Sequence, residues 1–147
     1  MQNHTPHVMV IDEIGRAKEV KAAHTCKQRG VRLLASAHGD LRKLLKNGEL
    51  NALVGGIKST TLGDGMAKEE AKKRGSSDVS KVKTEVRANE PTFDVVVEVR
   101  RGVLHEWLVT LDTASAVDSI LDRGSYTVQE RKRDPATGKI CLELKQV

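Results

Sequence analysis

The run Val8-Met9-Val10-Ile11-Asp12-Glu13-Ile14-Gly15 constrains the fold more than any other part of this 147-residue chain. Four apolar residues are followed at once by two adjacent carboxylates, and a glycine comes soon after them. A short continuous apolar run is typical of a strand buried in a parallel sheet. Open α/β sheets bind their ligands outside the carboxyl ends of such strands. The run therefore predicts two acids at the edge of a sheet, where a ligand site forms.

The residues that follow alternate between helix and strand patterns. Residues 16–29 are predicted to form a helix that ends at Gly30, and residues 31–35 a second strand. Asp40 is placed to cap a short helix with an apolar stripe over residues 41–45. Residues 57–62 are a third predicted strand. This alternation predicts an α/β fold with a parallel sheet.

Changes in composition divide the chain into three parts. Residues 1–64 hold the α/β pattern, and residues 65–92 are a charged linker with a predicted helix over 66–74 and an edge strand over 82–86. Residues 93–147 are a small α+β region. Its pattern predicts a strand hairpin, a helix capped by Asp112 or Thr113, and a second hairpin that turns over residues 134–138.

Four side chains are the candidates for chemistry. Asp12 and Glu13 follow the first predicted strand, and Ser36 and His38 follow the second. If the strands are neighbours, all four reach the same edge of the sheet. One carboxylate there can contact magnesium, which is usually held by one or two carboxylates together with substrate phosphates. The hydroxyl and the imidazole can sense a phosphate or orient a water. The alternative is that both strands simply end in polar loops and that His38 is exposed.

Other features limit the range of functions. The chain has no apolar run near the roughly 20 residues of a membrane span, and Cys26 and Cys141 lie too far apart for a metal or redox motif. These features favour an intracellular soluble protein with reduced thiols. The net charge of +5 is spread along the chain, so it is compatible with nucleic acid or phosphate ligands without identifying them. An Arg-x-x-x-His signature of single-stranded nucleic-acid binding, at residues 101–105, straddles a predicted turn and is interpreted as chance.

Residues 7–20, His-Val-Met-Val-Ile-Asp-Glu-Ile-Gly-Arg-Ala-Lys-Glu-Val, and residues 29–39, Arg-Gly-Val-Arg-Leu-Leu-Ala-Ser-Ala-His-Gly, carry a resemblance to a known family. They resemble the ATPases related to stage III sporulation protein AA, a group whose cyanobacterial and plastid members pair a P-loop ATPase with a single-stranded nucleic-acid-binding domain. The likeness continues through residues 50–64, 73–75 and 91–94 and then fades.

The resemblance implies the C-terminal part of a RecA-like P-loop NTPase sheet with an appended small α+β region. It implies ATP and Mg²⁺ as cofactors, Asp12 at the magnesium position and Glu13 as the catalytic base. Ser36, where relatives usually show Thr, and His38 would then stand at the phosphate-sensing position. The phosphate-binding loop of the family, Gly-rich and ending in Gly-Lys-Ser/Thr, is absent from these 147 residues, and its nucleic-acid-binding domain is not recognisable in residues 110–147.

The sequence thus predicts a partial P-loop ATPase, either a fragment or a chain with a mis-assigned start. Such a chain contributes the acids for hydrolysis of Mg-ATP but is inactive alone. Its predicted partners are ATP, single-stranded nucleic acid and further copies of itself, and its predicted location is the cytoplasm or a plastid. The alternative is a non-catalytic module that binds nucleic acid or protein on an ATPase-derived fold.

Overall fold

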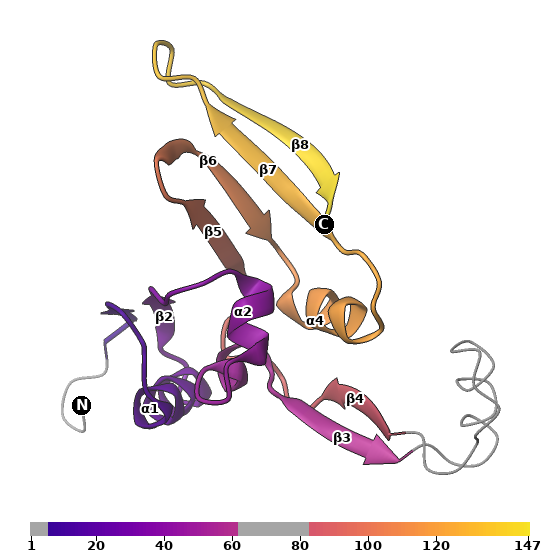
Figure 1. Ribbon diagram of the computed structural model, residues 1–147. Coiled ribbons are helices and arrows are strands. Elements are labelled where there is room, and N and C mark those ends of the chain that lie inside the picture. The colour runs from indigo at the N-terminus through magenta and orange to yellow at the C-terminus, as the bar shows by residue number, and fades with distance from the viewer. Residues whose placement is uncertain (1–5, 62–82) are drawn as a thin grey trace, which may run out of the picture.

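The protein, seen here as a computed structural model, is described over residues 6–61 and 83–147 (Figure 1). The predicted helix at 66–74 and part of the predicted linker lie outside these residues. The elements in chain order are β1 (Val8–Ile11), α1 (Ala17–Gln28), β2 (Arg32–Ala35), α2 (Leu41–Lys46), the 3-10 helix η1 (Asn51–Val54), β3 (Ile57–Thr61), β4 (Lys83–Arg87), β5 (Val96–Arg100), β6 (Val103–Thr110), α4 (Thr113–Leu121), β7 (Thr127–Arg133) and β8 (Ile140–Gln146).

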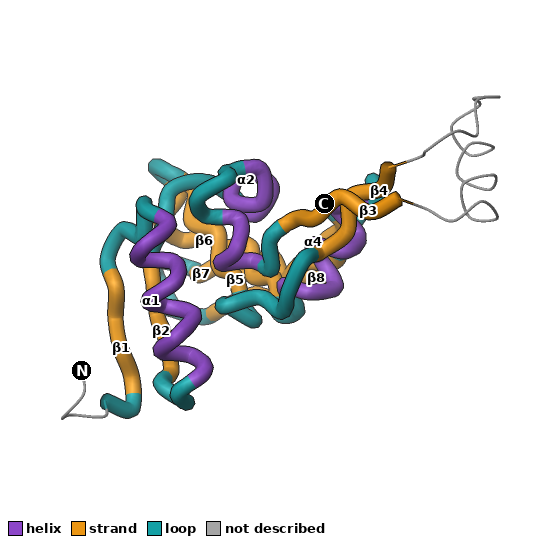
Figure 2. The backbone as a smooth tube through the Cα atoms, turned by 90° about the horizontal axis from the view of Figure 1, so that it is seen from below, coloured by secondary structure: helices purple, strands orange, loops and turns teal. Residues whose placement is uncertain are grey.

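Strands β1 and β2 form a parallel pair, in the register Val8↔Arg32 to Ile11↔Ala35. Helix α1 connects them and buries Val20, Ala23 and Cys26. The prediction that β1 is buried on both faces is wrong. Its residues Val8 and Val10 are 53% and 70% exposed, because α1 and the core cover only the other face of the pair (Figure 2).

The strand predicted over residues 57–62 is present as β3, but it does not extend the parallel pair. Strand β3 pairs antiparallel with β4, in the register Ile57↔Arg87 to Thr61↔Lys83, and takes no part in the β1–β2 sheet. Gly55 turns the chain toward this hairpin with a φ of 108°. A Cβ at Gly55 would lie 2.8 Å from the Arg87 side chain and 2.9 Å from the Asn89 carbonyl oxygen, so only glycine allows this close approach. The edge strand predicted over residues 82–86 is therefore confirmed as β4, inside the stretch that the sequence assigned to a linker.

The third sheet is an antiparallel meander in the order β5-β6-β7-β8. Both predicted hairpins are present, and helix α4 connects β6 to β7. The Asp112 side chain accepts a hydrogen bond from the Ser115 backbone N–H at 3.0 Å, which fixes the start of α4 as the capping prediction expected. Asp40 caps α2 in the same way through the Lys43 N–H, at 2.8 Å.

One hydrophobic core spans the predicted α/β part and the predicted C-terminal α+β part of the chain. Leu41, Leu45 and Val54 from residues 1–64 and Val117 and Val128 from residues 93–147 belong to the same buried cluster. The division of the chain into domains at residues 64 and 93 stays a prediction.

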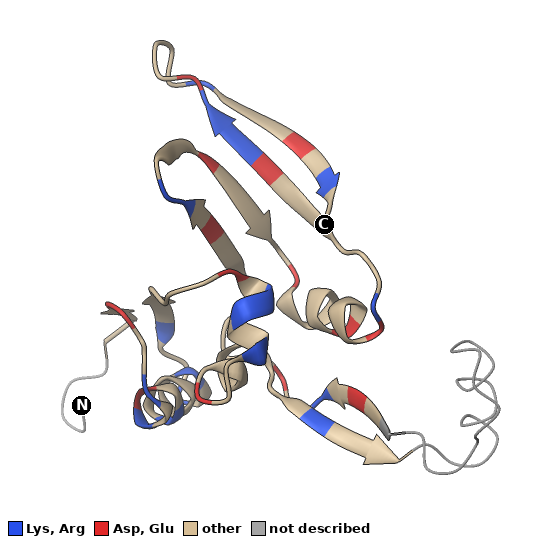
Figure 3. Ribbon diagram, viewed as in Figure 1, with Lys and Arg blue, Asp and Glu red and all other residues tan. Residues whose placement is uncertain are grey.

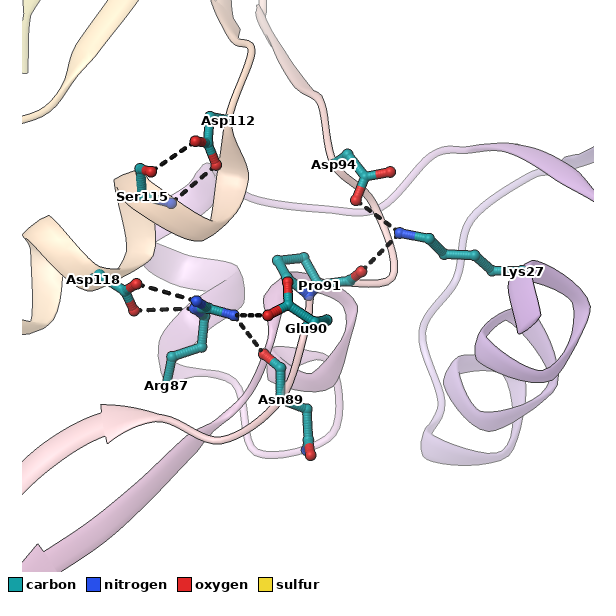
Figure 4. A network of polar contacts seen from close by, with 9 residues as sticks. All are labelled: Lys27, Arg87, Asn89, Glu90, Pro91, Asp94, Asp112, Ser115 and Asp118. Atoms are coloured by element: carbon teal, nitrogen blue, oxygen red, sulfur yellow. Dashed lines mark hydrogen bonds and ion pairs between the residues drawn. The ribbon is translucent and has the colours of Figure 1, made fainter. Parts of the chain in front are cut away.

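Ion pairs at the surface reinforce this packing (Figure 4). Lys27 Nζ in α1 donates to the Pro91 carbonyl oxygen at 2.9 Å and to Asp94 Oδ1 at 2.7 Å. The Arg87 guanidinium in β4 donates two bonds to the Asp118 carboxylate of α4, at 3.0 and 3.1 Å.

Candidate functional site

The carboxyl ends of β1 and β2 bring the four predicted residues together. Because Ile11 is paired with Ala35, the residues that follow them, Asp12 and Ser36, lie at the same level. The backbone continues the pairing past both strand ends. The Ser36 N–H donates to the Ile11 carbonyl oxygen at 3.0 Å, and the Ile14 N–H donates to the Ser36 carbonyl oxygen at 2.8 Å.

The Ser36 hydroxyl connects the two acids. Its Oγ donates to Asp12 Oδ1 at 2.7 Å and accepts from the Glu13 backbone N–H at 2.8 Å. One small side chain therefore orients the Asp12 carboxylate and holds the main chain of the next residue. The sequence predicted that these groups share an edge, but it did not predict that Ser36 binds both the Asp12 carboxylate and the Glu13 backbone.

Glu13 has an unusual backbone conformation, with a φ of 54°. This left-handed conformation costs free energy for a residue other than glycine. The hydrogen bond from the Glu13 N–H to the Ser36 hydroxyl is one of the contacts that stabilise it here. The Glu13 carboxylate turns toward His38, whose Nε2 lies 3.1 Å from Glu13 Oε1. The side chains of His38 and Glu13 are 88% and 69% exposed, so both are open to a ligand from solvent.

The turn after the two acids is anchored on both sides. Ile14 is 1% exposed and inserts into the core directly after Glu13. The backbone N–H groups of Gly15 and Arg16 donate to Glu19 Oε2 at 3.0 and 3.1 Å, and these bonds lower the pKa of the Glu19 carboxyl. Glu19 was not identified as a capping residue from the sequence. A glutamate three residues after the N-cap residue of a helix, here Arg16, is a known capping signal that could have identified it.

The four side chains do not by themselves form a metal site. In the part of the chain that the structure describes, no group of three or more His, Cys, Asp or Glu side chains could hold a metal ion. Asp12 is the one carboxylate at this edge whose oxygen is fixed by a hydroxyl donor. That donor set fits magnesium, which keeps several waters and takes further oxygens from a phosphate ligand.

A small cavity lies behind the site. It has a volume of about 110 Å³, and its walls include Ile14, Ser36, Ala37 and Phe93. Glu98 also lines it, and its Oε1 accepts a hydrogen bond from the Leu41 N–H at 3.1 Å, at the start of α2. The rear of the site is therefore mostly apolar, and its polar groups face the solvent.

Comparison with known proteins gives three relatives. The chain is 39% identical over 133 residues to "Uncharacterized protein ycf45" of Porphyra purpurea, a match that covers 90% of the chain and 22% of that protein. It is 47% identical over 100 residues to "Protein SEEDLING PLASTID DEVELOPMENT 1" of Arabidopsis thaliana, covering 67% of the chain and 14% of that protein. A ycf45 protein of Cyanidium caldarium is 53% identical over 68 residues, which are 46% of the chain and 20% of that protein.

No family model matches the chain, and no solved structure matches it. The predicted membership of the ATPases related to stage III sporulation protein AA is therefore wrong, because the relatives found are ycf45 and SEEDLING PLASTID DEVELOPMENT 1 proteins. Within residues 6–61 and 83–147, no helix has the length and apolar character that crossing a membrane requires. The chain is thus similar to one stretch, between 14% and 22% of the length, of ycf45 and SEEDLING PLASTID DEVELOPMENT 1 proteins.

Proposed function

We propose that the ends of β1 and β2 form one half of a magnesium–nucleotide site at which ATP is hydrolysed. The observation that supports this function best is the Ser36 hydroxyl, which joins the Asp12 carboxylate to the Glu13 backbone. Two adjacent acids with different partners suit two different tasks. Asp12 would hold the Mg²⁺, and Glu13 would orient and polarise the attacking water.

The contacts of each acid support this division of tasks. Asp12 Oδ1 is fixed by Ser36, and among the described residues no hydrogen bond engages Oδ2. One free, oriented oxygen is what a hydrated magnesium ion takes from protein. The Glu13 carboxylate contacts the imidazole of His38, which can hold it toward a water. Ser36 and His38 would couple the presence or absence of the phosphate to the ends of the two strands.

The other half of the site must cradle the phosphates. No Gly-Lys-Ser/Thr loop occurs in these 147 residues, so we expect no appreciable ATP hydrolysis by this chain alone. The phosphate-binding loop would come from other polypeptide, and the relatives are several times longer than the stretch they share with this chain. One relative has a name that refers to plastid development, and we propose a plastid as the place of action. Binding of single-stranded nucleic acid and self-association stay predictions.

The cation half of the proposal can be tested on the chain itself. Mn²⁺ added with ATP should broaden the amide resonances of Asp12, Glu13 and Ser36 before others, because a paramagnetic ion relaxes nearby nuclei. Asp12→Asn should remove this broadening. The matched control Asp122→Asn changes an exposed aspartate at the end of α4 and should leave it unchanged. Broadening that survives Asp12→Asn, or that begins elsewhere, contradicts the proposal.

Hydrolysis needs a second measurement, on a longer polypeptide that joins this chain to a phosphate-binding loop. Glu13→Gln should abolish magnesium-dependent ATP turnover there while nucleotide binding persists. Turnover by the 147-residue chain alone, lost in Glu13→Gln, would show that the missing loop is not required and would overturn the half-site.

A further inference from the structure

The two faces of the β5–β8 sheet differ in chemistry. Directly paired residues lie on the same face, and Val97↔Val109, Val99↔Trp107, Trp107↔Arg131 and Arg131↔Leu142 therefore belong to one face. We call this the open face, because most of its side chains are exposed; Val109 is the buried exception among the described residues, at 5% exposure. The other face carries Leu108 and Val128, which are 8% and 2% exposed and form part of the core.

Two lanes of aliphatic side chains run along the outer strands of the open face. On β5, Val97 and Val99 are 53% and 59% exposed. On β8, Ile140, Leu142 and Leu144 are 59%, 50% and 72% exposed. Exposed apolar side chains that follow one another along a strand make this face a candidate for an interaction site.

Charge is separated across the sheet. Its strands contain four glutamates, and the pairing places them all on the face opposite the open one: Glu98, Glu106, Glu130 and Glu143. On that opposite face Lys145 and Lys132 lower the pKa of the Glu130 carboxyl, so charges there compensate one another. The open face carries Arg131 and Arg133 of β7, a strand with Lys and Arg at its end (Figure 3). The ion pairs of the described part of β7 involve Lys132 and Lys145 with Glu130, and the Arg131 guanidinium donates to Gln129 Oε1 at 3.1 and 2.6 Å.

The spacing of the lanes suits a helix. Strands β5 and β8 are separated by β6 and β7, which places the two lanes about 14 Å apart at a strand spacing of about 4.8 Å. A helix with its side chains is about 10–12 Å wide. Laid along β6 and β7, it would contact Trp107 and Arg131 below and an aliphatic lane on each side. Trp and Arg are the residue types that dominate the energetics of protein interfaces.

The open face ends in a groove next to α4. The groove has a volume of about 570 Å³ and is lined by Ser115 and Ser119 of α4 and by Leu144 and Gln146 of β8, among others. Its hydroxyl and amide groups could bind the polar end of a helix that arrives along the sheet.

We propose that the open face binds an amphipathic, acidic helix of a protein partner. A second copy placed face to face would set the Arg131 and Arg133 of one copy against those of the other, and like charges oppose that arrangement. Single-stranded nucleic acid would satisfy the arginines, but it needs aromatic side chains for base stacking. Among Phe, Tyr and Trp, only Trp107 lies on the described open face, so successive bases would have no row of aromatic side chains to stack on. The positive charge of Arg131 and Arg133 favours carboxylates on the partner, and the two aliphatic lanes favour an apolar helix face.

The probe is a fluorescein-labelled, lactam-stapled helical peptide with Leu at positions i, i+3, i+4 and i+7 and Glu on its flanks. Fluorescence anisotropy should show saturable binding to the wild-type chain. Arg131→Glu with Arg133→Glu should weaken binding at least about tenfold, as expected when two cations on an interface become acids. Lys132→Glu with Lys145→Glu, on the opposite face, is the matched control and should leave the affinity within about twofold. Circular dichroism checks that each variant folds.

Three results would overturn the proposal. One is the absence of saturable binding, or equal binding by a peptide with Lys in place of Glu. Another is a dimer in size-exclusion chromatography with light scattering that Val99→Asp disrupts, which would assign the open face to a second copy. The third is displacement of the peptide by oligo(dT) with a steep salt dependence, which would assign it to nucleic acid. None of these results bears on the Mn²⁺ measurement at Asp12.

Discussion

Ser36→Ala removes the hydroxyl that connects the two strand ends, and its effect can be worked out from the contacts. The variant loses one bond from the Glu13 N–H and one charge-assisted bond to Asp12. A net hydrogen bond contributes about 0.5–1.5 kcal/mol, and a charged one somewhat more. Both groups are exposed, so water replaces part of each bond, and the lower end of the range applies. The loss is therefore about 1–2 kcal/mol before the backbone is considered.

The backbone of Glu13 partly offsets this loss. Its φ of 54° costs roughly 1 kcal/mol relative to the right-handed region. Without the Ser36 hydroxyl, Glu13 can relax and recover some of that cost. We therefore expect Ser36→Ala to lower the free energy of unfolding by about 1 kcal/mol, measured by urea denaturation. Ser125→Ala, an exposed control, should change it by less than about 0.5 kcal/mol.

A second substitution separates the two contributions. Glu13→Gly should raise the stability by about 1 kcal/mol, because glycine adopts a positive φ without strain. In the Ser36→Ala background, Glu13→Gly should raise the free energy of unfolding by less, because the strain at residue 13 is already partly released there. Equal gains in both backgrounds, or a Ser36→Ala effect no larger than that of Ser125→Ala, would refute the coupling.

Three further predictions concern other parts of the fold. Leu41→Ala, at a fully buried position of α2, should destabilise the protein by about 2–5 kcal/mol in the same urea assay. Arg87→Lys keeps the charge but loses the two-pronged contact with Asp118, so a drop of about 1 kcal/mol is expected and full retention of stability would contradict it. Ser115 lowers the pKa of Asp112 through its hydroxyl and backbone N–H, so this cap stabilises the protein above about pH 4 and the contribution is lost as the pH falls further. Asp112→Asn should therefore be less stable than wild type at pH 7, with the difference shrinking toward pH 3.

Local signals in the sequence predicted much of the fold. The caps at Asp40 and Asp112 mark helix starts because their carboxylates satisfy backbone N–H groups that lie close in sequence. The proximity of Asp12 and Ser36 was also predictable. Parallel neighbours joined by one helix bring their carboxyl ends to the same edge, and each of these residues directly follows its strand. The roles proposed for these side chains rest on that proximity and stay predictions.

The pairing of strands that are distant along the chain could not be predicted from the sequence. Nothing near β3 indicated that it would pair with β4 rather than join β1 and β2, because strand choice depends on contacts across the whole core. The open face is a similar case. The bulge between Val99 and Arg100 and the lengths of the turns set which residues share a face, so Trp107 and Arg131 could be placed together only once the register was known.

Within the described residues, the β1–β2 pair and the β5–β8 sheet each leave apolar side chains exposed on one face, and the two faces permit different conclusions. On the outer face of the β1–β2 pair, Val10 and Leu34 are 70% and 63% exposed. The charged residue that shares this face in β2 is Arg32, the first residue of that strand. Any apolar layer would fit there, so no partner follows. On the open face the glutamates are all excluded and Arg131 lies beside Trp107, so an occupant must bring negative charge as well as apolar surface. Exposure shows that a face can be covered, but the arrangement of charge around it determines which partner can cover it.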